Sequence, residues 1–283
     1  MIRQRTIKRP VTVSGTGLQT GVAVSVTLRP APATSGISFT RTDLPGRPAL
    51  RINSLDLSDS AQAERRTAVG FGAAQIQTTE HLLSAIAGLS IDNASIELDN
   101  VELPCLDGSA KGFADLIMSA GIEEQDAERR FFRTDEVIWC SHGDCLLALF
   151  PDEVFRVSYT LSYPGIGAQF FSAEVDERSF YSEIAPARTF CSEAEALELL
   201  KRGLGKGANY ENTLVMGAKG PINNTLRFAD EPARHKVLDL IGDISLAAVP
   251  VKGHVIAIKS GHRLNMELVA KIRRIAAKNK REN

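Results

Sequence analysis

Alternating apolar and polar residues dominate the first third of the chain. Within residues 12–28, Val22, Val24 and Val26 fall on one face, and Ile37–Arg41 repeats the same period of two. This alternation is typical of half-buried strands, and the intervening Gly and Pro residues mark turns. The pattern predicts a sheet in this part of the chain.

The apolar period then changes to that of a helix. Residues 79–87 place Leu82, Leu83 and Ile86 on one face, and Gly88 follows as a helix end. A strand at Ala94–Leu98 and a second helix at residues 112–120 are expected next. Residues 123–130 hold one hydrophobic residue in eight, a composition typical of a linker.

After this segment, the order of strands followed by helices repeats. The pattern predicts strands at 134–138, 146–150 and 156–161, helices at 193–202 and 232–247, a strand at 253–259 and a helix from 265 onward. Two successive halves of this kind predict an α+β fold. We expect two helix-on-sheet domains, residues 1–126 and 127–283, with a ligand cleft between them.

Composition excludes several classes of protein. The chain has 283 residues, 43% of them hydrophobic and 24% charged, with a net charge of −1. These values exclude a disordered or collagen-like chain and give no overall field that would attract nucleic acid. The basic stretch 271–281 favours a solvated helix end over a binding arm. No apolar run reaches the ~18 residues of a membrane helix, and the first residues lack a signal-peptide core, so we expect a cytoplasmic protein.

The cysteines and glycines offer alternatives that the spacing disfavours. Cys140 and Cys145 flank His142, but with no second pair to complete four ligands a hairpin turn is favoured over a metal corner. The cluster at residues 15–21 has no long helix signal after it, as a dinucleotide-binding loop requires, and residues 203–207 lack the Lys-Ser/Thr pair of a phosphate-binding loop. Four scattered cysteines are expected to stay reduced.

The histidines carry the strongest chemical signal. His235 and Asp239 are separated by four residues on the helix expected at 232–247, so their side chains rise from one face with Cβ atoms ~5–6 Å apart. Glu80 and His81 lie together in the first turn of another expected helix, and His262 is a further proton carrier. Two histidines, one aspartate and an adjacent carboxylate are the inventory of a metal-dependent amide hydrolase.

The spacing of these residues does not exclude other interpretations. A His–Asp pair four residues apart is more often a surface hydrogen bond than a pair of metal ligands. The same side chains could serve as caps and core hydrogen bonds in a two-domain binding or scaffold protein, and a zinc hydrolase could act on another N-acylated sugar. Spacing does not bring positions 81, 235 and 262 together.

Seven sequence blocks narrow these alternatives. They are Gly15-Thr-Gly-Leu-Gln-Thr-Gly, Thr79-Glu-His-Leu-Leu-Ser-Ala, Ile91-Asp-Asn, Glu102-Leu-Pro-Cys-Leu-Asp-Gly-Ser, Ala187-Arg-Thr-Phe, Arg234-His-Lys-Val-Leu-Asp-Leu-Ile-Gly-Asp and Gly261-His-Arg-Leu-Asn. In this order, the chain resembles the zinc-dependent UDP-3-O-acyl-N-acetylglucosamine deacetylases of lipid A biosynthesis, from residue 6 to about residue 271. The resemblance implies two similar domains that face each other across the active site, each with a small insert, the second near residues 191–218.

The resemblance also implies a metal and a base. His81, His235 and Asp239 correspond to the zinc ligands, with Fe²⁺ as an alternative to Zn²⁺ in the cell, and Glu80 corresponds to the general base. The implied partner is a UDP-3-O-acyl-N-acetylglucosamine substrate, with no nucleic acid, and the protein is expected to be a monomer.

The remaining site residues follow from the same resemblance. His262 corresponds to the cationic acid and oxyanion partner, Asp243 to its support, and Thr189 to a residue aimed at the tetrahedral intermediate. The positions near the substrate's acyl, sugar and phosphate groups correspond to Leu18, Phe190 and Lys236. Gln19 departs from the family, which has histidine there; glutamine keeps a hydrogen-bonding amide but carries no titrating proton.

Overall fold

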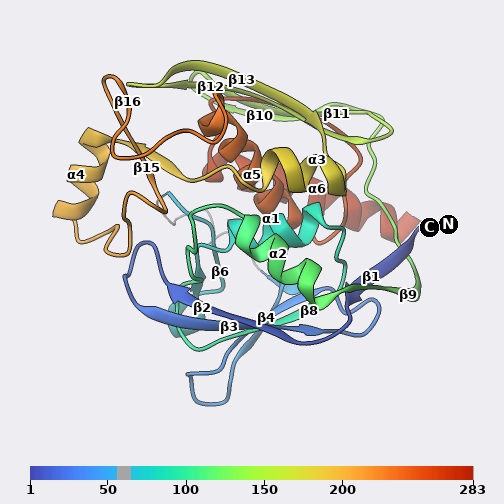
Figure 1. Cartoon of the computed structure of the whole chain (residues 1–283). Coiled ribbons are helices and arrows are strands. Elements are labelled where there is room, and N and C mark those ends of the chain that lie inside the picture. Colours follow the sequence, from blue (N-terminus) through green and yellow to red (C-terminus); the bar gives the residue numbers. More distant parts are fainter. Residues whose placement is uncertain (56–64, 283) are drawn as a thin grey trace.

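The computed structural model describes residues 1–55 and 65–282, in which two sheets form outer layers with helices between them (Figure 1). The main helices of the inner layers are α1 (Glu80–Gly88), α2 (Lys111–Ala120), α5 (Glu231–Ser245) and α6 (His262–Glu282). The predicted α+β fold, with helices covering one face of each sheet, is confirmed. None of the described helices has the length and apolar character needed to cross a membrane.

The two sheets share one topology. The first has the order β2-β3-β8-β4-β5 and the second β10-β11-β17-β12-β13; in each, the third and fourth strands are parallel and all other neighbours antiparallel. The first sheet comprises β2 (Val11–Thr16), β3 (Ala23–Pro30), β4 (Ile37–Arg41), β5 (Ala49–Arg51) and β8 (Ala94–Leu98). The second comprises β10 (Ile138–His142), β11 (Cys145–Phe150), β12 (Phe155–Tyr163), β13 (Gly167–Glu174) and β17 (Gly253–Ile258).

Alternation along the strands divides core from surface, as the sequence predicts for β3. Val24 and Val26 are buried against the helices, whereas Thr12 and Thr27 form an exposed hydroxyl pair 2.8 Å apart on the outer face. Val22 was wrongly expected to share the inner face. It lies in the turn between β2 and β3 and is 44% exposed.

The linker predicted at residues 123–130 is not an irregular segment. Residues 123–128 lie in β9 (Ile122–Glu128), which pairs antiparallel with β1 (Arg3–Ile7). The ribbon has only two strands, so most side chains of β9 remain exposed and the sequence needs no apolar alternation. The boundary between residues 126 and 127 therefore stays a prediction, and it falls within a strand.

Two further elements begin three or more residues away from the expected position. The strand predicted at 134–138 begins only at Ile138, and the last helix begins at His262 instead of Asn265. Cys140 and Cys145 lie on the two strands of the β10–β11 hairpin, as predicted, and all four cysteines are free. The first of these errors arose because residues 134–137 contain no Gly or Pro that would mark where the strand begins.

Smaller elements make up the rest of the secondary structure in the described residues. A three-stranded sheet with one helix lies where the second-domain insert is expected, and consists of β14 (Phe190–Ser192), α4 (Glu193–Lys201), β15 (Leu214–Gly217) and β16 (Gly220–Pro221). The other short elements are η1 (Ile52–Ser54), β6 (Ala68–Val69), η3 (Gly72–Ala74), β7 (Ile76–Gln77), α3 (Glu177–Ser179) and the π-helix η4 (Phe180–Ile184).

A single glycine allows α1 and α5 to touch. A Cβ atom on Gly242 of α5 would lie 2.1 Å from the carbonyl oxygen of Glu80 at the start of α1. The atoms that this Cβ would meet belong to the backbone of Glu80, so no side-chain movement could relieve the clash. The contact brings the first turn of α1 against the segment of α5 that carries Asp239 and Asp243.

We expect Gly242→Ala to separate the two helices and to lower the free energy of unfolding by ~1–3 kcal/mol, the usual cost of an overpacked core. Urea denaturation measures this change. Gly261→Ala is the matched control, because its added methyl group would meet nothing within 4 Å. Equal stability of Gly242→Ala and the control would contradict the contact.

Candidate functional site

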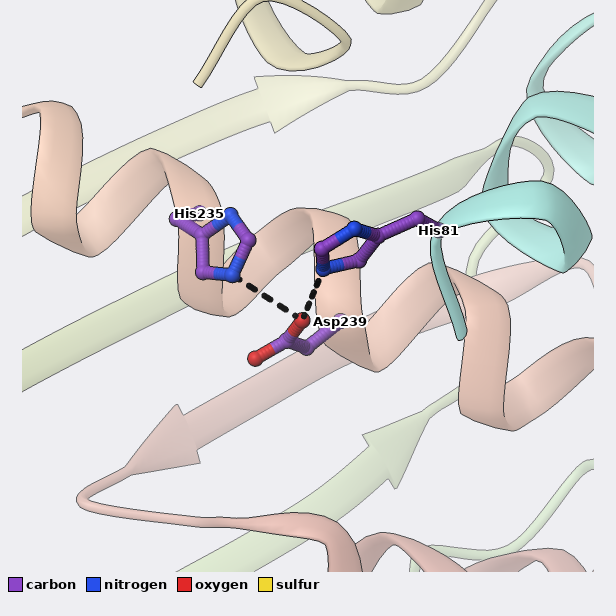
Figure 2. A group of neighbouring side chains, drawn as sticks. All are labelled: His81, His235 and Asp239. Atoms are coloured by element: carbon purple, nitrogen blue, oxygen red, sulfur yellow. Dashed lines mark ion pairs between the residues drawn. The ribbon is translucent and has the colours of Figure 1, made fainter. Parts of the chain in front are cut away.

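Three side chains converge at the point where α1 meets α5 (Figure 2). His81 comes from the first turn of α1, and His235 and Asp239 rise from one face of α5, as their spacing predicts. The Nε2 atoms of His235 and His81 lie 3.3 Å and 3.8 Å from Asp239 Oδ1. All three residues are buried, and each offers a ligand atom within 4.8 Å of the others.

Neither His235 Nε2 nor Asp239 Oδ1 carries a proton, so no hydrogen bond can form between these two facing atoms. His235 Nδ1 lies 3.0 Å from the carbonyl oxygen of Ala187, so Nδ1 carries the proton and donates it, and the neutral ring has a lone pair on Nε2. That lone pair faces Asp239 Oδ1, a buried oxygen with no hydrogen-bond partner. Two acceptors in contact repel each other, and a cation between them removes the repulsion. The donor set therefore fits a divalent metal.

The protonation states of the cluster also favour metal binding. Burial, followed by the neighbouring His235, lowers the pKa of His81 to about 3, and burial lowers the pKa of His235. Both rings are thus neutral, the form that binds metal. Burial alone would raise the pKa of Asp239, but its neighbours, the His235 ring and the ammonium group of Lys236, hold that pKa below its ordinary value. Lys236 Nζ donates to Asp239 Oδ2 at 2.5 Å, which leaves Oδ1 as the free ligand atom.

Glu80 lies beside the cluster, also at the start of α1. Its Oε2 accepts a hydrogen bond from the backbone N–H of Thr67 at 3.0 Å. Burial raises the pKa of Glu80 to about 7, against the opposing effect of the charge on His262. A carboxylate whose pKa lies near neutrality can both accept and release a proton, which is what a general base requires.

His262 faces the cluster from the start of α6. Its Nδ1 lies 2.8 Å from Asp243 Oδ2, and its Nε2 lies 3.9 Å from Asp239 Oδ2. Burial alone would lower the pKa of His262, but the carboxylate of Asp243 raises it to about 9. Asp243 is fully buried and also accepts from Thr67 Oγ1 and Asn265 Nδ2. His262 is therefore a charged donor at neutral pH, with Nε2 pointing toward the cluster.

One cavity of about 820 Å³ joins these groups. Its lining includes nine of the ten site residues that the sequence analysis selects: Leu18, Glu80, His81, Thr189, Phe190, His235, Lys236, Asp239 and His262. The tenth, Asp243, lies behind His262. Phe190 makes an edge contact with the ring of His235, with centroids 6.2 Å apart.

Comparison with known proteins gives a consistent result. The model of the UDP-3-O-acyl N-acetylglycosamine deacetylase family matches residues 4–274. A UDP-3-O-acyl-N-acetylglucosamine deacetylase from Anaeromyxobacter sp. (strain Fw109-5) is 42% identical over 95% of this chain and 88% of its own length. The same enzyme from Bdellovibrio bacteriovorus is 38% identical over 96% of this chain and 90% of its own length. The chain belongs to this deacetylase family.

Membership in the deacetylase family confirms the resemblance seen in the seven sequence blocks. A bifunctional LpxC/FabZ enzyme from Chlorobaculum tepidum is also similar, with 36% identity over 99% of this chain and 66% of the enzyme. The deacetylase family is one of metalloenzymes, and the His81, His235 and Asp239 group provides this chain with a place for a metal.

The sequence analysis missed two side chains that organise the site. Thr67 contacts both Glu80 and Asp243, yet it lies in a segment without periodicity, 13 residues before Glu80, and had no signal. For Asn265 the sequence did contain a signal, because this residue lies three positions after His262 on the same helix and could be expected on the same face. The carbonyl of Ala187, which orients His235, could not be found from side-chain identity.

The purified protein is expected to hold one divalent metal ion per chain. His235→Ala removes a ligand and should reduce metal content to a small fraction of that value, as measured by elemental analysis after dialysis. His142→Ala, at an exposed histidine on β10, is the matched control and should retain the metal. A fully metallated His235→Ala protein would overturn the assignment of this ligand.

Proposed function

We propose that this chain hydrolyses the 2-acetamido group of a UDP-3-O-acyl-N-acetylglucosamine and releases acetate and the free amine, an early committed step of lipid A biosynthesis. The observation that carries the proposal is the convergence of Glu80 and His262 on the His81, His235 and Asp239 group within one cavity. The names of the relatives supply the substrate.

The metal in this proposal is Zn²⁺, with Fe²⁺ as an alternative in the cell, held by His81, His235 and Asp239. When bound at such a site, zinc polarises a carbonyl group and lowers the pKa of water toward ~7. Two neutral imidazoles and one carboxylate are a common ligand set for catalytic zinc.

The residues around the metal site divide the proton transfers between them. Glu80 accepts a proton from the attacking water as its oxygen bonds to the acetamide carbon. The C–N bond then breaks, and His262 Nε2 donates a proton to the leaving nitrogen, while Asp243 holds the Nδ1 side of the ring. Positive charge on His262 also stabilises negative charge that develops on the carbonyl oxygen. Thr189 lines the cavity and completes the polar groups proposed to face the intermediate.

An apolar part of the cavity supports recognition of a lipid-bearing sugar. Phe190 and several aliphatic side chains of the insert line it: Ala196, Leu197, Leu199, Leu200 and Val215. We place the 3-O-acyl chain against these residues and Leu18, which also lines the cavity. The partly buried Lys236 is proposed to contact the substrate's phosphate, although in this structure its Nζ donates to Asp239.

The pH profile of kcat/KM should be bell-shaped. Activity rises as Glu80 loses its proton near pH 7, and it falls as His262 loses its proton near pH 9. His262→Ala should remove the basic limb and reduce kcat/KM by ~10²-fold or more. Asp243→Asn should shift that limb to lower pH, because the lost carboxylate no longer stabilises the charged ring. An unchanged basic limb in His262→Ala would exclude this residue as the acid.

A substrate that carries the 3-O-acyl chain should be deacetylated far faster than UDP-N-acetylglucosamine without it. Each methylene group removed from water contributes ~0.8 kcal/mol, so a few buried methylenes exceed ~10-fold. Comparing kcat/KM for the two substrates measures this preference. Equal values would leave a metal-dependent deacetylase but reject the proposed lipid-bearing substrate.

A further inference from the structure

Two glycine-containing loops from opposite halves of the chain meet at the edge of the cavity. The loop between β2 and β3 supplies two carbonyl acceptors, one on Leu18 and one on Gln19. The backbone N–H of Gly207 donates to Leu18 O at 3.1 Å, and that of Lys206 donates to Gln19 O at 3.3 Å. The backbone N–H of Gly205 donates to the side-chain Oε1 of Gln19 at 3.1 Å. Two adjacent residues therefore bind three consecutive amides of the insert.

Glycine is required for this approach. A Cβ atom on Gly207 would lie 2.2 Å from the carbonyl oxygen of Gly17. Because this oxygen belongs to the backbone, no side-chain movement could relieve the clash. The 203–207 loop, which has no phosphate-binding pattern, thus has a packing role. We call the set of contacts between residues 17–19 and 205–207 the loop clasp.

A buried carboxylate holds the other side of the loop clasp. Glu102 accepts hydrogen bonds from the backbone N–H groups of Gln19 and Thr20, at 2.9 Å and 2.8 Å, and from the hydroxyl of Thr20 at 2.7 Å. It also accepts from the hydroxyl of Thr78, two residues before Glu80, at 2.8 Å. Glu102 is only 2% exposed. The loop that carries Gln19 is therefore fixed to the segment that begins α1.

We propose that Gln19 is a positioning residue, whose amide fixes the insert loop across the cavity and thereby sets recognition of the acyl chain. Gln19 and Gly205 both line the cavity, so the hydrogen bond between them is part of its wall and holds the insert loop in place at this edge. An insert released from the clasp would lose part of the preformed apolar wall and would have to be ordered each time a substrate binds. The inference about recognition rests on the proposed function, whereas the clasp itself does not.

The side chain of Gln19 suits this role because its acceptor does not titrate. A histidine at the same position can accept a hydrogen bond only while its ring is neutral. The amide oxygen of glutamine accepts at every pH at which the protein is folded. Gln19, which stands where the family has histidine, therefore makes its contact with Gly205 through a group that does not titrate.

Hydrogen–deuterium exchange of the metal-loaded full-length protein tests the clasp without any substrate. Gln19→Met retains the length of the side chain but lacks a strong acceptor, and should accelerate exchange of residues 203–208 by ~10-fold, the scale of one lost hydrogen bond. Gly207→Ala disrupts the clasp by introducing a clash with the carbonyl oxygen of Gly17, and should accelerate exchange to a similar extent. Gln19→His, measured at pH 8 where an ordinary imidazole is neutral, should restore protection.

Kinetics with two substrates then test the role in recognition. For Gln19→Met, the KM of the acylated UDP-sugar should rise by ~10-fold while kcat stays nearly constant, because binding common to the ground and transition states is lost. The kinetics of UDP-N-acetylglucosamine without the acyl group should not change. Lys201→Ala, at an exposed residue of α4, is the matched control for both experiments.

Unchanged exchange in both Gln19→Met and Gly207→Ala would overturn the clasp. Faster exchange with equal losses on the two substrates, or a fall in kcat in place of a rise in KM, would overturn its role in acyl recognition. If the unmodified protein itself shows no preference for the acylated substrate, the proposed function fails, and the exchange result still decides the clasp.

Discussion

The backbone contact between Gly242 and Glu80 is the constraint on which the site depends. A missing side chain at one position of α5 lets the first turn of α1 lie directly against it. Residue 81 then faces residue 239, and residue 80 lies near residue 243, although these pairs are far apart in the sequence. A larger residue at position 242 would move the base and one proposed ligand together, away from the other two ligands. The packing of α1 against α5 therefore sets the relative positions of the groups in the site.

Within this arrangement, the buried His81 and His235 are neutral, whereas the partly buried His262 is charged. His235 donates from Nδ1 to a backbone carbonyl, and burial keeps it neutral, as it does His81. His262 instead faces the carboxylate of Asp243, which keeps it protonated despite its burial. A neutral ring suits a metal ligand and a charged ring suits an acid, so for His235 and His262 the partner at Nδ1 sets the role that Nε2 can play.

Local patterns in the sequence predicted the features that depend on neighbours along the chain. The period of four residues placed His235 and Asp239 on one face of a helix, and alternation identified the inner face of β3. The strand within residues 123–130 was missed because its pairing with β1 is a long-range contact that stabilises a charged segment. Thr67 and the contact between Gln19 and Gly205 were missed for the same reason. The meeting of positions 81, 235 and 262 also requires packing, and the family resemblance alone suggested it.

Anomalous X-ray diffraction at the zinc absorption edge, from crystals of the metal-loaded protein, tests the central claim most directly. The account predicts one ion bonded to Nε2 of His81, Nε2 of His235 and Oδ1 of Asp239, with Lys236 remaining near Oδ2. Glu80 and His262 should lie nearby without binding the ion. An ion bound instead through Glu80 or His262, or one located outside the contact between α1 and α5, would contradict this account of how the fold builds the site.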